Sequence, residues 1–205
     1  MNANDAEVHN HYAFFLLAQG RFGEAILELR DALTLDPLST RYISHLGQAY
    51  YFARRYNEAI GQYRQALELD SKDALVHEWL GDAYQRVGDE SGALAEWRTA
   101  LTLRGDAAVA RISAARGFAA AVRALAQSKL ERCIRQKNRG EFVPAIDYAR
   151  AYISLNQAEK GIAWLEKASR QRNRFAFFLN TDPFYDPLRG DARFAAIARS
   201  VEVPK

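Results

Sequence analysis

The sequence predicts an all-α solenoid of stacked helical hairpins, and three observations carry this prediction. First, residues of one kind recur every 34 positions in the first half of the chain. Two such columns are Ala25, Ala59 and Ala93, and Ala32, Ala66 and Ala100. Second, apolar residues within each period are spaced as on amphipathic helices. Third, only 5 prolines interrupt 205 residues. A period of this size marks a repeat architecture in which each unit stacks on its neighbours.

Each period contains two expected helices joined by a turn. The apolar spacing predicts helices over 6–19 and 22–35, over 40–53 and 56–69, and over 74–87 and 90–103. The corresponding repeats span about 6–39, 40–73 and 74–105. Ala13, Gly47 and Gly81 lie in the middle of the first helix of each repeat. Because glycine inside a helix costs about 1 kcal/mol relative to alanine, we expect the paired helices to approach closely there.

The three periods resemble tetratricopeptide repeats, whose pattern is W-x2-L-G-x2-Y, then A-x3-F, A and P. The second period reads Ile43-x2-Leu46-Gly47-x2-Tyr50, with Ala59-x3-Tyr63 and Ala66. The first and third read His9-x2-Tyr12-Ala13-x2-Leu16 and His77-x2-Leu80-Gly81-x2-Tyr84. The opening Trp is replaced by His or Ile, and the closing Pro survives only at Pro37. The resemblance covers about half the chain and implies a right-handed α-solenoid of the tetratricopeptide type.

The pattern loosens after Leu103 and then partly returns. We expect a degenerate hairpin over 106–139, with helices over 107–115 and 119–137, and a further repeat over 141–173 whose helix begins at Pro144. Residues 174–205 are expected to cap the solenoid, with Asp191 capping a final helix over 192–200. Residues 182–194 resemble the tail that ends repeat regions of bacterial multidomain signalling regulators. We expect one solenoid domain over 1–205.

The two halves of the chain differ in charge. Residues 1–105 carry ten Lys and Arg against fifteen Asp and Glu, whereas residues 106–205 carry eighteen against ten. A basic group in the second half is a candidate anion-binding site. It comprises Lys129, Arg132, Arg135, Lys137 and Arg139. Such a group can bind an acidic partner, nucleic acid or lipid headgroups, or it can be a solvated helix face. The lack of aromatic residues within the run argues against nucleic acid.

Motifs for catalysis or cofactor binding are absent from the sequence. It contains no G-x-G-x-x-G, G-x-x-x-x-G-K-[ST], G-x-S-x-G or H-E-x-x-H. We therefore expect no enzyme activity, no cofactor and no metal, and we expect the four His to pack or to lie on the surface. Cys133, the single cysteine, is expected to be a buried thiol. A polar N-terminus and the lack of an 18-residue apolar run predict a cytoplasmic protein without a membrane partner.

The resemblance also implies a binding surface. In tetratricopeptide domains the first helix of each repeat lines a concave groove that holds partner peptides. The matching positions here are Asn10, Phe14, Leu17, Arg41, Ser44, Gln48, Tyr51, Glu78, Asp82, Gln85 and Arg150. Aromatic and amide side chains suit a peptide held by anchors and hydrogen bonds. We expect a non-catalytic protein-interaction scaffold. The alternatives are an adaptor for anionic ligands or nucleic acid through the basic half, and a self-associating structural protein.

Overall fold

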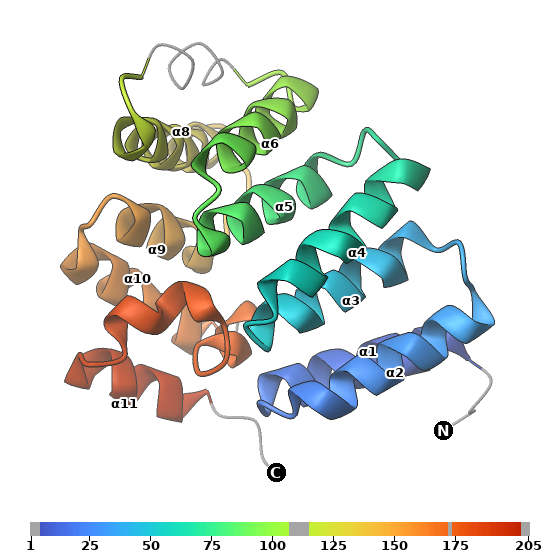
Figure 1. Cartoon of the computed structure of the whole chain (residues 1–205). Coiled ribbons are helices and arrows are strands. Elements are labelled where there is room, and N and C mark those ends of the chain that lie inside the picture. Colours follow the sequence, from blue (N-terminus) through green and yellow to red (C-terminus); the bar gives the residue numbers. More distant parts are fainter. Residues whose placement is uncertain (1–4, 107–114, 172–173, 202–205) are drawn as a thin grey trace. The chain divides into compact units, whose positions relative to one another are not determined.

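The computed structural model describes residues 5–106, 115–171 and 174–201, which contain helices and no strand (Figure 1). The chain divides into two compact units, unit 1 over Met1–Asp106 and unit 2 over Ala107–Pro204. No helix in the described part of the chain is long and apolar enough to cross a membrane.

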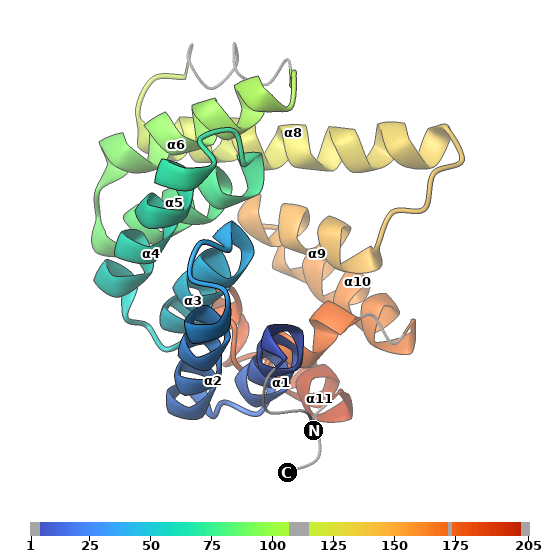
Figure 2. The same cartoon turned by 90° about the vertical axis from the view of Figure 1, so that its right-hand side faces the viewer.

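Unit 1 consists of three helical hairpins. Its helices are α1 (Ala6–Ala18), α2 (Phe22–Leu35), α3 (Thr40–Phe52), α4 (Tyr56–Leu69), α5 (Ala74–Val87) and α6 (Glu90–Leu103). Within each hairpin the two helices pack along each other, and α2 packs on α3 as α4 packs on α5 (Figure 2). The six helices predicted here are confirmed, with bounds that agree to within one residue. The predicted all-α fold of the tetratricopeptide type is confirmed as well.

A small residue on the first helix and a large residue on the second set the spacing of each hairpin. A Cβ atom built on Gly47 would lie 2.5 Å from Cε1 of Tyr63, and one on Gly81 would lie 2.5 Å from Cδ1 of Trp97. Both rings are almost fully buried. The first hairpin has alanine at the glycine position, and there the aromatic position holds Leu29. The expected close approach is confirmed, and glycine appears where the opposing side chain is aromatic.

Successive hairpins of unit 1 are joined by a repeated arginine–tyrosine contact. Arg30 Nη2 donates to the hydroxyl of Tyr50 at 2.9 Å, and Arg64 Nε donates to the hydroxyl of Tyr84 at 2.9 Å. In each case the arginine belongs to the second helix of one hairpin and the tyrosine to the first helix of the next. The 34-residue period therefore repeats a specific hydrogen bond as well as apolar packing.

Unit 2 is less regular. Its elements are α8 (Phe118–Asn138), α9 (Ala145–Ser154), α10 (Ala158–Arg170), the 3₁₀ helices η1 (Arg174–Phe178) and η2 (Pro183–Leu188), and α11 (Ala192–Ser200). One apolar cluster joins α9, α10, η1, η2 and α11, and a second joins α8 to α9 and α10. The helix predicted over 107–115 falls outside the described residues except for its last position. A single solenoid domain across both units stays a prediction.

The C-terminal segment is fixed to α9 by one buried carboxylate. Asp182 Oδ2 lies 2.8 Å from Arg150 Nη1, while Asp182 Oδ1 accepts a 2.8 Å hydrogen bond from the backbone N–H of Phe184 at the start of η2. The Arg150 guanidinium also lies 4.1 Å from the ring centroid of Phe184. Asp191 caps α11 as expected, because its Oδ1 accepts from the backbone N–H of Arg193 at 2.8 Å.

Candidate functional site

The first helices of the three hairpins, α1, α3 and α5, carry every binding residue predicted in unit 1. Adjacent members of this set contact each other, α1 with α3 and α3 with α5. We call the surface that they share the A-helix face. Its residues are Glu7, Asn10, Phe14, Leu17, Arg41, Ser44, His45, Gln48, Tyr51, Glu78, Asp82, Gln85 and Arg86.

Side-chain contacts tie neighbouring helices of the A-helix face together. Arg41 on α3 pairs with Glu7 on α1 at 2.5 Å, and Arg86 Nε on α5 donates to the hydroxyl of Tyr51 on α3 at 3.1 Å. These partners are 34 and 35 residues apart, so the contacts follow the repeat. The two contacts thus restrain the side chains of Glu7, Arg41, Tyr51 and Arg86.

The predicted residues of the face differ in exposure. Arg41 and Gln85 are exposed, whereas Phe14, Gln48, Tyr51, Glu78 and Asp82 are half-buried. Leu17 is fully buried, and Asn10 and Ser44 are almost fully buried. Ser44 Oγ donates to the backbone carbonyl of Arg41 at 2.9 Å. A proposal about ligand contact therefore rests on the exposed and half-buried residues, and these three buried positions support the face from beneath.

The acidic residues at the α5 end of the face have partners within unit 1. Glu78 Oε2 lies 2.5 Å from Arg104 Nη1. Asp82 Oδ1 accepts a 3.0 Å hydrogen bond from the indole Nε1 of Trp97. The carboxylate of Glu78 is thus ion-paired, and that of Asp82 is held by a hydrogen bond from a neutral indole. The face also presents amides and aromatic rings.

His45 is a half-buried residue of the face that the sequence analysis did not single out. Its Nδ1 lies 2.6 Å from Oδ1 of Asn10, and its ring packs edge-on against Phe14 with centroids 4.8 Å apart. Burial lowers the pKa of His45 to about 4, and the nearby Arg41 guanidinium acts in the same direction. The imidazole is therefore neutral at pH 7 and donates Nδ1–H to Asn10. The only feature of the sequence that pointed to this contact was the presence of two polar residues, Asn10 and His45, 35 positions apart.

The candidate anion-binding residues lie along the second half of α8 and just beyond its end. Lys129 and Arg132 are half-buried, whereas Arg135, Lys137 and Arg139 are exposed. Arg135 lies 3.8 Å from Glu131, and Arg139 lies 2.9 Å from Glu141. At about 100° per residue, Arg135 and Lys137 point to different sides of the helix. The basic residues are thus partly neutralised and spread around α8.

Two further predicted residues have structural partners in unit 2. Arg150 is the residue that holds Asp182 and the C-terminal segment. Cys133 is 4 % exposed, and burial raises the pKa of its thiol. The buried thiol expected from the sequence is confirmed, and its environment disfavours the nucleophilic thiolate.

Comparison with known proteins agrees with this architecture. The family model of a tetratricopeptide repeat matches residues 55–88, which hold α4 and α5. The crystal structure of MamA shares the fold with a TM-score of 0.50 and 18 % identity, over 86 % of this chain and 96 % of that one. A search of curated protein sequences finds no significant match.

Two other solved structures align with this chain at lower TM-scores. The Sgt2 tetratricopeptide domain from Aspergillus fumigatus aligns at 22 % identity, over 68 % of this chain and 85 % of that one, with a TM-score of 0.49. The first tetratricopeptide domain of Spaghetti (RPAP3), solved with the HSP90 peptide SRMEEVD, aligns at 17 % identity over 64 % and 96 %, also at 0.49. The matched repeat and the hairpin architecture show that the chain has the tetratricopeptide type of fold and contains a tetratricopeptide repeat over residues 55–88.

Proposed function

We propose that this chain is a non-catalytic scaffold that binds a peptide segment of a partner protein on the A-helix face. The observation that carries the proposal is the set of ties between successive first helices, Arg41 to Glu7 and Arg86 to Tyr51. The second tie holds the ring of Tyr51, which stands on the same helix as the amide of Gln48, so a peptide would find an anchor already in position near a hydrogen-bonding group. Such preorganisation lowers the entropic cost of binding. The proposal includes a cytoplasmic setting.

The proposed anchors are Phe14 and Tyr51, and the proposed hydrogen-bonding groups are the amides of Gln48 and Gln85. All four are half-buried or exposed. Half-buried aromatic side chains are typical binding hot spots because they lose little conformational freedom when they are covered. Both rings are braced, Phe14 against His45 and Tyr51 against Tyr56 at a centroid separation of 5.4 Å.

The direct test is selection of a random dodecamer peptide phage library on the full chain, followed by titration of the enriched peptides. Replacing both Phe14 and Tyr51 by alanine should weaken binding by at least tenfold, as expected for loss of two aromatic anchors. Leu27→Ala is the matched control, because Leu27 is 57 % exposed on α2, outside the A-helix face. Equal losses in the double variant and in Leu27→Ala would contradict the proposal.

Salt dependence separates this proposal from the anion-binding alternative. The affinity of binding through aromatic anchors and neutral amides should change little between about 50 mM and about 500 mM salt. Binding through Lys129, Arg135 and their neighbours should instead fall steeply as salt rises. Enriched sequences that are acidic and lose affinity in high salt, with no effect of the Phe14 and Tyr51 changes, would favour the alternative.

Self-association is a second candidate, favoured by one specific observation. Phe15 on α1 is 43 % exposed, while Ala49 and Ala83, at the same repeat position, are fully buried. In those two repeats the second helix of the preceding hairpin packs on the helix that carries the position, and no described helix precedes α1. Phe15 stacks on half-buried Tyr12 with centroids 6.0 Å apart, so α1 presents an apolar surface that suits α1 of a second copy.

Light scattering after size exclusion tests the second candidate. We expect a dimer whose population falls in Phe15→Asp, since a charge in an apolar contact is unfavourable. A monomeric wild type at about 100 μM would contradict self-association. That outcome would leave peptide binding on the A-helix face untouched, because Phe15 is not part of that face.

A further inference from the structure

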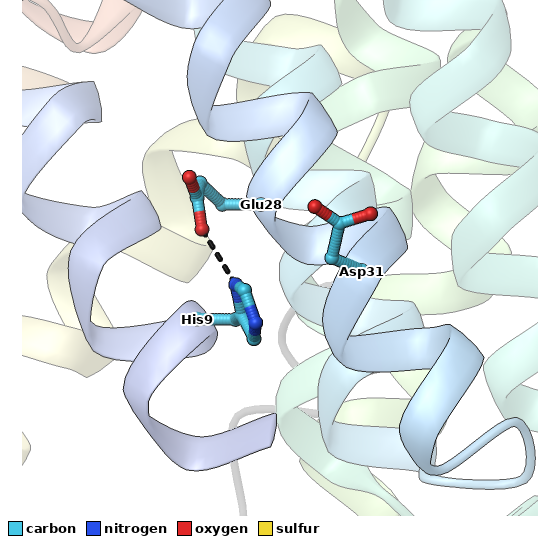
Figure 3. Close-up of side chains that lie close together, drawn as sticks. All are labelled: His9, Glu28 and Asp31. Carbon is cyan, nitrogen blue, oxygen red and sulfur yellow. Dashed lines mark hydrogen bonds and ion pairs between the residues drawn. The ribbon is translucent and has the colours of Figure 1, made fainter. Parts of the chain in front are cut away.

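One histidine and two carboxylates meet between α1 and α2. His9 projects from α1, and Glu28 and Asp31 project from the facing side of α2 (Figure 3). His9 Nδ1 lies 2.7 Å from Glu28 Oε2. One ligand-type atom from each residue falls within 4.8 Å of the others. His9 and Glu28 are half-buried, whereas Asp31 is exposed.

The third repeat holds the same pair without the third residue. His77 Nδ1 lies 2.5 Å from Glu96 Oε2, and these residues stand 68 positions after His9 and Glu28. A His–Glu pair by itself is therefore a tie between the two helices of a hairpin. The position of Asp31 is occupied by Thr99 in the third repeat. The first repeat thus differs from its internal counterpart by one carboxylate.

The added carboxylate has a cost that a cation would remove. Glu28 and Asp31 are three residues apart on one helix, so their side chains are neighbours, and like charges at this spacing repel. Among the described residues, no hydrogen bond joins the side chain of Asp31 on α2 to α1. A divalent cation between His9 and the two carboxylates would convert the repulsion into attraction.

From this arrangement we propose that His9, Glu28 and Asp31 form a binding site for a divalent transition metal ion of the Zn²⁺ class. An imidazole nitrogen with carboxylate oxygens suits Zn²⁺ and its first-row neighbours. Mg²⁺ and Ca²⁺ prefer sites made of oxygen alone. Ligand atoms around tetrahedral Zn²⁺ lie about 3.3 Å apart, from bond lengths of about 2.0–2.1 Å. The proposal requires a rotation of the exposed Asp31 side chain to close the difference from 4.8 Å.

Three ligands leave one position of the metal for water or for a group of a partner. The bound ion joins α1 to α2 and so stabilises the first hairpin, because a ligand that binds only the folded state shifts folding by mass action. The site lies on the second-helix side of α1, and none of its residues belongs to the A-helix face. The proposal is thus independent of peptide binding.

The test is calorimetric titration of the full chain with ZnCl2 at pH 7, paired with thermal unfolding. Wild type should bind one equivalent and show a raised unfolding midpoint, and Asp31→Thr should lower the affinity at least tenfold. Asp31→Thr copies the natural third repeat at an exposed position, so the fold is preserved. The reciprocal Thr99→Asp variant should gain a second equivalent.

Two controls separate this site from unspecific binding by histidine. His11 is 72 % exposed and lies 3.5 Å from Glu7, so His11→Gln removes a two-ligand surface pair and should leave the titration unchanged. MgCl2 in place of ZnCl2 should give no heat beyond dilution. Equal Zn²⁺ binding by wild type and Asp31→Thr would overturn the assignment. So would no binding by wild type, or no gained equivalent in Thr99→Asp.

Discussion

The two units of the chain are held together by different kinds of contact. Unit 1 repeats several of its contacts: the arginine–tyrosine bond, the glycine–aromatic contact and the His–Glu pair all occur twice, at multiples of 34 residues. Unit 2 uses contacts that occur once. Tyr148 donates to the carbonyl of Cys133 at 2.9 Å and stacks on Trp164, and Asp182 holds Arg150.

The difference has an energetic consequence. When a contact is replicated, stability is a sum of similar local contributions, and the loss of one member affects mainly its own hairpin. When a contact is unique, several elements depend on it, because no equivalent bond compensates for its loss. We therefore expect substitutions at unique contacts to cost more than substitutions at replicated ones.

The largest expected effect is in unit 2, at Asp182. Asp182→Ala removes the partner of Arg150 and the cap of η2, and the Arg150 guanidinium is left partly buried without its carboxylate. We expect a loss of about 3 kcal/mol. Urea denaturation measures the loss, and hydrogen exchange should place it in residues 145–200. Asp191→Ala is the control, because it removes a cap and an exposed pair and should cost about 1 kcal/mol. Equal losses would remove the distinction that we draw.

His45 tests the same idea inside unit 1, since its contact with Asn10 is not repeated. Folding lowers its pKa from an ordinary 6.5 to about 4, so the unfolded chain binds more protons between these values. The contribution of His45 to the free energy of unfolding is therefore fully present above pH 6.5. It is lost as the pH drops toward 4, by up to about 3 kcal/mol. Urea denaturation at several pH values measures this change. His45→Gln should flatten the profile between pH 6.5 and 4, whereas His11→Gln should not; a flat wild-type profile would be contrary to this expectation.

A smaller loss is expected at the glycine–aromatic contact. Gly81→Ala places a methyl group against the buried Trp97 ring, and overpacking of this kind costs about 1–3 kcal/mol. Gly61→Ala is the matched control, because a Cβ there meets nothing within 4 Å and helix propensity should stabilise the chain by about 0.5–1 kcal/mol. Thermal and urea unfolding compare the two. Trp97→Leu, which copies the Leu29 position, should reduce the cost of Gly81→Ala; an unchanged cost would locate the strain elsewhere.

The sequence predicted unit 1 well because its information is repeated. Three copies of one apolar pattern gave every helix of unit 1 to within one residue, and the glycine column indicated the close contacts. The anchoring of the C-terminal segment was not predictable, because Arg150 and Asp182 are 32 residues apart and occur only once. A pair that occurs only once produces no repeated pattern in the sequence.

The proposed binding face shows the same limit at the level of side chains. Repeat position placed its residues on α1, α3 and α5 but did not give their exposure. Asn10 and Ser44 stand at positions assigned to ligand contact, yet both are nearly buried. Their burial depends on what lies at neighbouring positions, such as His45 beside Asn10, and those neighbours differ between the repeats. Predicted binding to the face therefore stays a prediction at each residue.

The arginines that recur every 34 residues, Arg30, Arg64 and Arg98, give the smallest expected effect. They also give the clearest comparison, because Arg98 lacks the repeated hydrogen bond. Arg64 donates to Tyr84, whereas Nε of Arg98, 34 positions later, is buried without a hydrogen-bond partner among the described residues. Arg64→Met should cost about 1 kcal/mol. Arg98→Met keeps the aliphatic packing and removes an unsatisfied donor, so it should be neutral or slightly stabilising in the same urea assay. If both variants lose the same stability, the column contributes through packing alone, and the repeated hydrogen bond is not what joins the hairpins.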